Sequence, residues 1–135
     1  MAGLRLDSAG VIKMKTLDDA LVHLQRIHGI VERYAIAVKQ NQPSQVFTMN
    51  LRRQLPSLAA NLKAQFGMVA DQVTALNLAT TRGASENQRV RALREGVAQV
   101  RQALEIALVQ TKERHAVKDV EGADKSSADG SGRNE

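Results

Sequence analysis

Residues 86–115 read ENQRVRALREGVAQVRQALEIALVQTKERH and carry the clearest helical pattern in the chain. Apolar or small side chains recur every seven residues in two interleaved rows, a spacing that places both rows on one face of a helix. The first row is Val90, Val97, Leu104 and Thr111, and the second is Leu93, Val100 and Ala107. Ser85 and Gln88 resemble a capping box ahead of this pattern. We therefore predict a helix over residues 86–115.

The same spacing appears in residues 17–41. The two rows here are Leu17, Leu24, Val31 and Val38, and Ala20, Ile27 and Tyr34. Thr16 and Asp19 resemble a capping box ahead of these rows, and Pro43 follows them where a helix is expected to end. We therefore predict a second helix over residues 17–41.

Residues 44–82 also repeat at helical spacing, but Pro56 interrupts them. Proline removes one hydrogen bond of a helix and disfavours helical geometry at the residue before it. We therefore predict a short helix over residues 44–55, a break at Pro56 and a further helix over residues 57–82.

Amphipathic helices cannot bury their apolar faces alone, so helices joined by short turns are expected to pack side by side. We predict an all-α fold, an antiparallel bundle of three long helices plus a shorter helical segment before Pro56. The predicted bundle domain spans residues 16–115. A loosely ordered N-terminal arm over residues 1–15 precedes it. A disordered C-terminal tail over residues 116–135, with almost nothing to bury, follows it.

The composition of the 135 residues agrees with this fold class. Aromatic residues make up 2% of the chain, which is too few for a typical β-sandwich or barrel. The absence of cysteine excludes disulfides and thiol chemistry and fits a reducing compartment. No apolar run is long enough to span a membrane, and the first residues do not resemble a secretory signal. We therefore expect a cytoplasmic protein.

Motifs for catalysis, metal binding or cofactor binding are not found. The histidines are His23, His28 and His115, and the first two are five residues apart, so they do not share a helix face. The carboxylates do not pair for acid–base chemistry, and no glycine-rich phosphate loop is present. We therefore expect a protein without enzymatic activity, cofactor or metal.

The segment His23–Gly29 resembles the phosphoacceptor region of histidine-phosphotransfer domains, which are helical bundles of about this size. In that family Lys and Gly follow the histidine at short spacing. Here Arg26 lies near the position of the Lys, whereas Ile27 lies where the small residue is expected. The resemblance implies a signalling domain with His23 as phosphoacceptor.

Arginines give a further alternative, because the chain carries a net charge of +5. Five of them lie around the last predicted turn and in the first half of the last predicted helix: Arg82, Arg89, Arg91, Arg94 and Arg101. The guanidinium group suits phosphate, so these residues predict a basic nucleic-acid-binding helical protein. Glutamates lie among these arginines, and no aromatic residue lies among them to stack on nucleic-acid bases. Contact with an acidic protein partner is therefore the competing interpretation.

Protein–protein interaction is the function that we favour from the sequence. The heptad-like rows suit pairing with helices of another protein or of a second copy. Phe47, Met49 and Leu51 cannot all lie on one face of a helix, so at least one is expected to face a partner. We predict partner contacts by these three residues and by the adjacent Arg52 and Arg53. The chain is then a non-enzymatic adaptor, chaperone-like protein or assembly factor.

Overall fold

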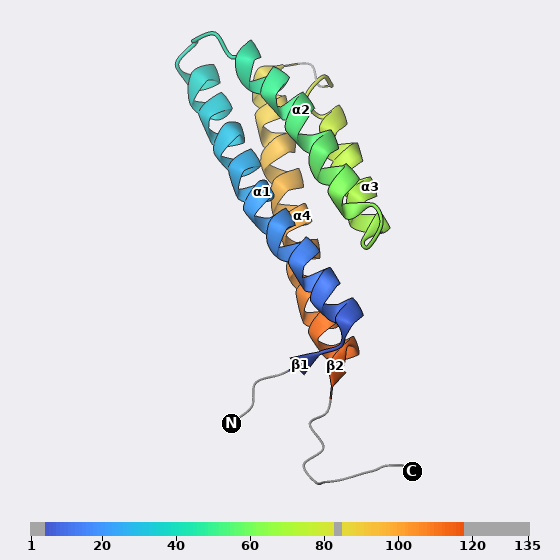
Figure 1. Cartoon of the computed structure of the whole chain (residues 1–135). Helices are drawn as coiled ribbons and strands as arrows, with labels where there is room; N and C mark the ends of the chain where they lie inside the picture. Colours follow the sequence, from blue (N-terminus) through green and yellow to red (C-terminus); the bar gives the residue numbers. More distant parts are fainter. Residues whose placement is uncertain (1–4, 83–84, 118–135) are drawn as a thin grey trace, which may run out of the picture.

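The computed structural model describes residues 5–82 and 85–117 of the chain. Within these ranges, four helices pack against one another and two short strands form a ribbon (Figure 1). The elements are β1 (Arg5–Leu6), α1 (Ser8–Lys39), α2 (Gln45–Leu62), α3 (Gly67–Leu78), α4 (Glu86–Arg114) and β2 (Ala116–Val117). The predicted all-α helical bundle is confirmed. Residues 118–135 of the predicted disordered tail and residues 1–4 of the predicted arm lie outside the described residues.

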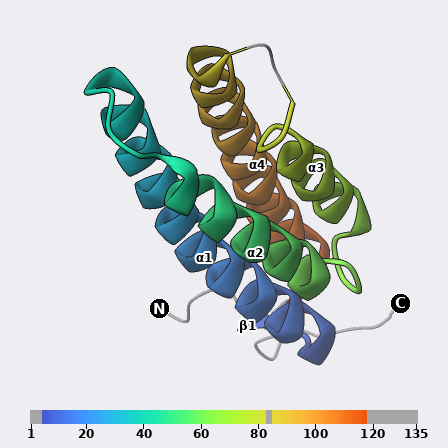
Figure 2. The ribbon, with the colours of Figure 1, turned by 90° about the horizontal axis from the view of Figure 1, so that it is seen from above.

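Two long helices and a shorter hairpin make up the bundle. Helices α1 and α4 contain 32 and 29 residues and are therefore about 48 and 43 Å long. Helices α2 and α3 contain 18 and 12 residues. Helix α2 packs along α1, and α3 packs against both α2 and α4. The hairpin covers the half of the long pair where α1 ends and α4 begins (Figure 1), and from above α3 lies beside α4 (Figure 2).

The core follows the rows that the sequence predicts. Every residue of the two predicted apolar rows on α4 is buried. The rows on α1 are also buried, with the exception of Val38, which is partly buried and packs against the edge of the core. The buried apolar positions of the hairpin are Leu51, Leu55, Leu58, Ala59, Leu62, Ala70, Val73 and Leu76. Helix α4 begins where predicted, and Ser85 Oγ accepts a hydrogen bond from the Gln88 amide at 3.2 Å. No helix of the described residues is long and apolar enough to cross a lipid bilayer.

The predicted break at Pro56 is wrong. Helix α2 continues through Pro56 to Leu62, and the chain reverses only at residues 63–66. Pro56 lies on the exposed side of α2, whereas Leu55 and Leu58 on either side of it are buried against α1 and α3. Burial of these leucines therefore stabilises the helix across a proline whose ring is exposed to solvent. Phe66 then leaves helical geometry and packs its ring on the core from the turn.

The predicted start of the first helix is also wrong, because α1 begins at Ser8 rather than at residue 17. Its cap is Asp7, whose carboxylate accepts a hydrogen bond from the Gly10 amide at 2.7 Å. Thr16 lies inside the helix and donates to the Ile12 carbonyl at 3.1 Å instead of capping. Gly10, which belongs to the predicted loose arm, is buried within α1.

Gly10 and the two strands join the ends of the long helices. A Cβ at position 10 would lie 2.5 Å from the His115 Cβ, so only glycine lets α1 approach the end of α4 this closely. Strand β1 pairs antiparallel with β2, and the Asp7 amide donates to the His115 carbonyl at 3.0 Å. Residues 5–15, predicted as a loose arm, therefore belong to β1 and α1, and residues 116–117 of the predicted tail form β2.

Candidate protein-interaction surface

Helix α2 presents an apolar face to solvent as well as to the core. Its buried leucines, Leu51, Leu55, Leu58 and Leu62, repeat at spacings of four and three. The opposite side carries Val46, Met49, Arg53 and Pro56, which repeat at spacings of three, four and three. We call these four residues the α2 outer face. Val46 is 64% exposed and Met49 is 54% exposed, so the face offers two uncovered apolar side chains one turn apart.

A surface hollow of about 510 Å³ lies at the start of this face. Its lining residues are Gln45, Val46, Met49, Arg52 and Arg53. The hollow thus combines apolar side chains with two guanidinium groups, a combination typical of the anchors and rims of protein interfaces.

The charged residues of helix α2 are all positive. Residues 33–70 contain no Asp or Glu, and helix α2 itself carries Arg52 and Arg53 without any acidic residue. Arg53 makes no hydrogen bond or ion pair with the part of the chain that the structure describes. A partner surface that carries Asp or Glu side chains therefore complements this face.

The structure separates the five residues predicted to contact a partner. Met49 and Arg53 lie on the α2 outer face, and Arg52 lines its hollow. Phe47 is half-buried and packs against the core, and Leu51 has no exposed surface, so Leu51 is not available to a partner. Phe47 and Leu51 are one helical turn apart and turn inward together.

Val46 is one of the two residues of this face, with Pro56, that the predicted contacts omitted. Its spacing to Met49 and Arg53, three and seven residues, is the signal that places the three on one side of a helix. That signal was available in the sequence, because the helix predicted over residues 44–55 already contains all three residues.

The five arginines of the nucleic-acid alternative do not form one surface. Arg94 binds both carboxylate oxygens of Glu32 at 2.9 and 2.7 Å, and Arg101 donates to Gln25 at 3.0 Å. Hydrogen bonds from Arg94 lower the pKa of Glu32, so this pair stays ionised. Arg89 is half-buried, while Arg82 and Arg91 are exposed. Two of the five thus bind side chains of α1 rather than project freely.

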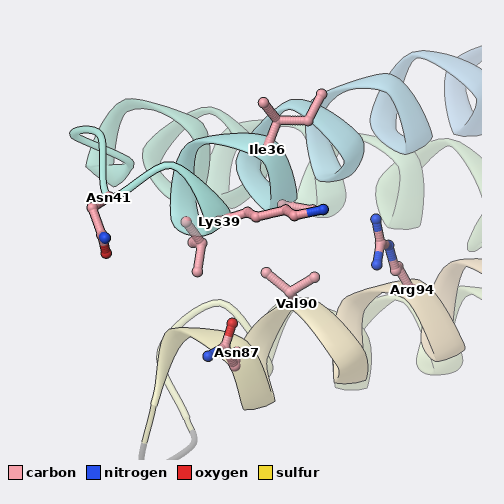
Figure 3. Close-up of a pocket in the computed structure, with 8 residues that line it drawn as sticks. Ile36, Lys39, Asn41, Asn87, Val90 and Arg94 are labelled. Carbon is pink, nitrogen blue, oxygen red and sulfur yellow. The ribbon is translucent and has the colours of Figure 1, made fainter.

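A second hollow of about 630 Å³ lies between the end of α1 and the start of α4 (Figure 3). Lys39 from α1 and Arg94 from α4 reach into the gap between the two helices, with Asn87 and Val90 beside them (Figure 3). Its lining contains neither a carboxylate nor a histidine, so it holds no acid–base pair. The bond to Glu32 neutralises Arg94, which leaves Lys39 as the remaining charge.

His23, the residue of the phosphotransfer resemblance, is half-buried between α1 and α2. Its Nε2 lies 2.7 Å from Gln54 Oε1. An amide oxygen only accepts hydrogen bonds, so Nε2 carries the hydrogen and its lone pair is not free. Gln54 Nε2 in turn donates to Asn50 Oδ1 at 3.4 Å. The ring is therefore held within a chain of side-chain amides.

Among residues 5–82 and 85–117, no group of three or more His, Cys, Asp or Glu side chains is placed to hold a metal ion. No known protein family, curated protein or solved structure matches the chain. The chemistry of the chain's own surface is therefore what bears on its function.

Proposed function

We propose that the chain is a non-enzymatic protein–protein interaction module of the cytoplasm, acting as an adaptor, chaperone-like protein or assembly factor. It binds a segment of another protein that carries apolar and acidic side chains together. The observation that carries this proposal is the α2 outer face, which exposes Val46 and Met49 beside two arginines on a helix without acidic residues.

The energetics of this face favour binding through its apolar residues. Complete burial of a Val or Met side chain contributes about 1.5–3 kcal/mol of favourable free energy. A little more than half of Val46 and of Met49 is exposed, so a partner that covers them gains about 1 kcal/mol or somewhat more of binding free energy from each. The arginines add little affinity at an exposed rim, but they attract an acidic partner and orient it.

A protein partner fits these residues better than a nucleic acid does. Nucleic-acid binding rests on several free cations that contact phosphates together. Arg94 and Arg101 are engaged with α1, and α4 carries Glu95 and Glu105 among its arginines. The two exposed apolar side chains of the α2 outer face have no role in phosphate contact.

Photocrosslinking in the native host tests the proposal. A photoreactive residue at position 49 is compared with the same residue at position 22, because Met49 and Val22 are 54% and 57% exposed on different helices. We expect position 49 to form an adduct with one other protein, and the attachment site to lie in a segment containing both apolar and acidic residues. Position 22 is expected to form no such adduct.

Several outcomes would contradict the proposal. Equal adducts at both positions, or none at position 49, would exclude the α2 outer face as the contact. An adduct with nucleic acid would favour the nucleic-acid alternative, and an adduct between two copies of the chain would replace a foreign partner with self-association.

A further inference from the structure

A polar pocket interrupts the apolar interior at the end of the bundle where α2 and α4 begin. It has a volume of about 230 Å³. Its lining residues are Ser44, Gln45, Thr48, Arg52, Thr80, Thr81, Glu86 and Arg89. Ser44, Thr48 and Thr80 are buried, although buried positions elsewhere in the described chain are almost all apolar. We call these eight residues the polar pocket.

The three buried hydroxyl groups of the pocket each donate a hydrogen bond to another group of the chain. Ser44 donates to the Glu86 carboxylate. Thr48 donates to the Gln45 carbonyl at 3.0 Å, and Thr80 donates to the Asn77 carbonyl at 2.7 Å. Since each hydroxyl has one hydrogen, these groups have no hydrogen left for a ligand.

The side-chain donors that remain are the guanidinium groups of Arg52 and Arg89 and the amide of Gln45. Arg52 is held by long hydrogen bonds, from Nε to Thr80 Oγ1 at 3.4 Å and from Nη2 to the Thr80 carbonyl at 3.3 Å. Arg89 Nε is buried without a hydrogen-bond partner in the described structure. Neither arginine forms an ion pair with a carboxylate of the described residues.

Tyr34 is a buried polar neighbour of Arg89. Its side chain is completely buried and does not line the pocket, and its hydroxyl makes no short hydrogen bond among the described residues. Burial raises the pKa of Tyr34, and the side chains of Arg89 and Glu86 lie close enough to its hydroxyl to influence that pKa through hydrogen bonding. The buried Nε of Arg89 is therefore the group that indicates a polar ligand, because buried polar groups are rarely left unpaired.

We propose that the polar pocket binds an oxyanion, a carboxylate or phosphate group, between Arg52 and Arg89. The charged donors of the pocket are guanidinium groups, whose planar fork matches the paired oxygens of such anions. Two arginines and Glu86 leave a net positive charge in the lining. This proposal does not depend on the proposed function.

The pocket also adjoins the α2 outer face, because Gln45 and Arg52 line both hollows. The oxyanion therefore has two possible sources with the same chemistry. One is a free phosphate, and the other is the carboxylate of an acidic side chain on a protein seated against the outer face.

Nuclear magnetic resonance of the arginine side chains tests this site on the full chain. The Nε–Hε signals of Arg52 and Arg89 are followed while phosphate, acetate or chloride is added at constant ionic strength. We expect both signals to shift to saturation with phosphate or acetate and not with chloride. Saturation with phosphate alone identifies a free phosphate, and saturation with acetate identifies a carboxylate.

Matched variants make the test specific. Arg89→Gln is expected to weaken binding at least tenfold, whereas Arg91→Gln, an exposed arginine on the same helix, leaves it unchanged. Arg52→Gln provides a second loss-of-binding variant if Arg89→Gln proves unstable by circular dichroism. Linear, unsaturated shifts that chloride reproduces would overturn the proposal, as would equal affinity in Arg89→Gln and Arg91→Gln.

Discussion

Gly29 and Gly96 lie inside the two long helices, in opposite surroundings. A Cβ at position 29 would meet only the end of the Arg33 side chain, at 3.5 Å. A Cβ at position 96 would overlap with Leu76 Cδ1 and approach its Cγ to 3.2 Å. Leu76 is buried, so it has little room to move away. Gly29 thus only weakens a helix, whereas Gly96 allows α3 to pack closely on α4.

The substitution Gly29→Ala is expected to raise the free energy of unfolding by about 1 kcal/mol, because alanine favours the helix. Gly96→Ala is expected to lower it by about 1–3 kcal/mol, because the added methyl overpacks the contact with Leu76. Urea denaturation of both variants measures the difference. If Gly96→Ala stabilised the chain as much as Gly29→Ala, the close packing of Leu76 on Gly96 between α3 and α4 would be contradicted.

Asp7 is the residue through which pH is expected to act on the end of the bundle. The hydrogen bond from the Gly10 amide lowers the pKa of Asp7 below 3.8, and the contact with His115 lowers it further. A carboxylate with a lowered pKa stabilises the fold above its unfolded pKa and loses this effect as the pH falls through the folded pKa. The contribution of Asp7 is therefore full near neutral pH, begins to fall as the pH approaches the unfolded value of 3.8, and is lost once the pH is below the lowered pKa of the folded state.

The variants Asp7→Ala and Asp7→Asn separate the cap from the charge. Asp7→Ala is expected to lower the thermal midpoint at neutral pH more than Asp7→Asn, because asparagine still accepts the Gly10 hydrogen bond. Their differences from the wild type are expected to shrink in acid. A midpoint difference that stays constant between neutral pH and about pH 3 would contradict a charged Asp7 cap.

At the scale of the helices, Pro56 shows where local preference yields to packing. Proline normally ends or kinks a helix, but here the leucines on both sides of it are buried, and the ring lies on the exposed side. The break lies instead at residues 63–66, where Phe66 enters the core from a turn. The position of a turn within a continuous apolar row depends on how far the neighbouring helices extend. The helix propensity of the local residues does not predict that length.

The substitution Pro56→Ala tests the continuous helix. Alanine restores the amide that the Arg52 carbonyl lacks and meets no neighbour on the exposed side, so the variant is expected to be more stable than the wild type. The gain is expected to be below the roughly 3 kcal/mol by which proline disfavours a helix interior, because proline also restricts the unfolded chain. Thermal unfolding checks this. Destabilisation by Pro56→Ala would indicate that α2 requires the proline bend.

At the scale of the molecule, the sequence predicts which apolar rows form the core, but it does not predict which polar side chains pair between the helices. Heptad spacing correctly placed Leu24, Val97 and Leu104 inside, because burial of one helix face depends only on period. The ion pair of Glu32 with Arg94 depends on how α1 and α4 are rotated and shifted against each other, which spacing does not specify. Such pairs decide which arginines remain free to bind a partner.

The candidate surface was predicted in part for the same reason. Met49, Arg52 and Arg53 follow from the apolar and basic residues near the start of α2. The burial of Leu51 follows from its spacing to Leu55 and Leu58, once the helix is known to continue through Pro56. The polar pocket combines residues from α2, α4 and the segment after α3, so only the folded chain shows it.

The affinity of the crosslinked partner for two matched serine variants decides whether α2 is the helix on which the partner docks. Val46 is 64% exposed on the α2 outer face, and Val22 is 57% exposed on α1, so Val46→Ser and Val22→Ser make the same chemical change at similar exposure. We predict that Val46→Ser raises Kd about tenfold, equivalent to about 1.4 kcal/mol, while Val22→Ser leaves it unchanged. Equal Kd values for the two variants would contradict the account of α2 as the docking helix.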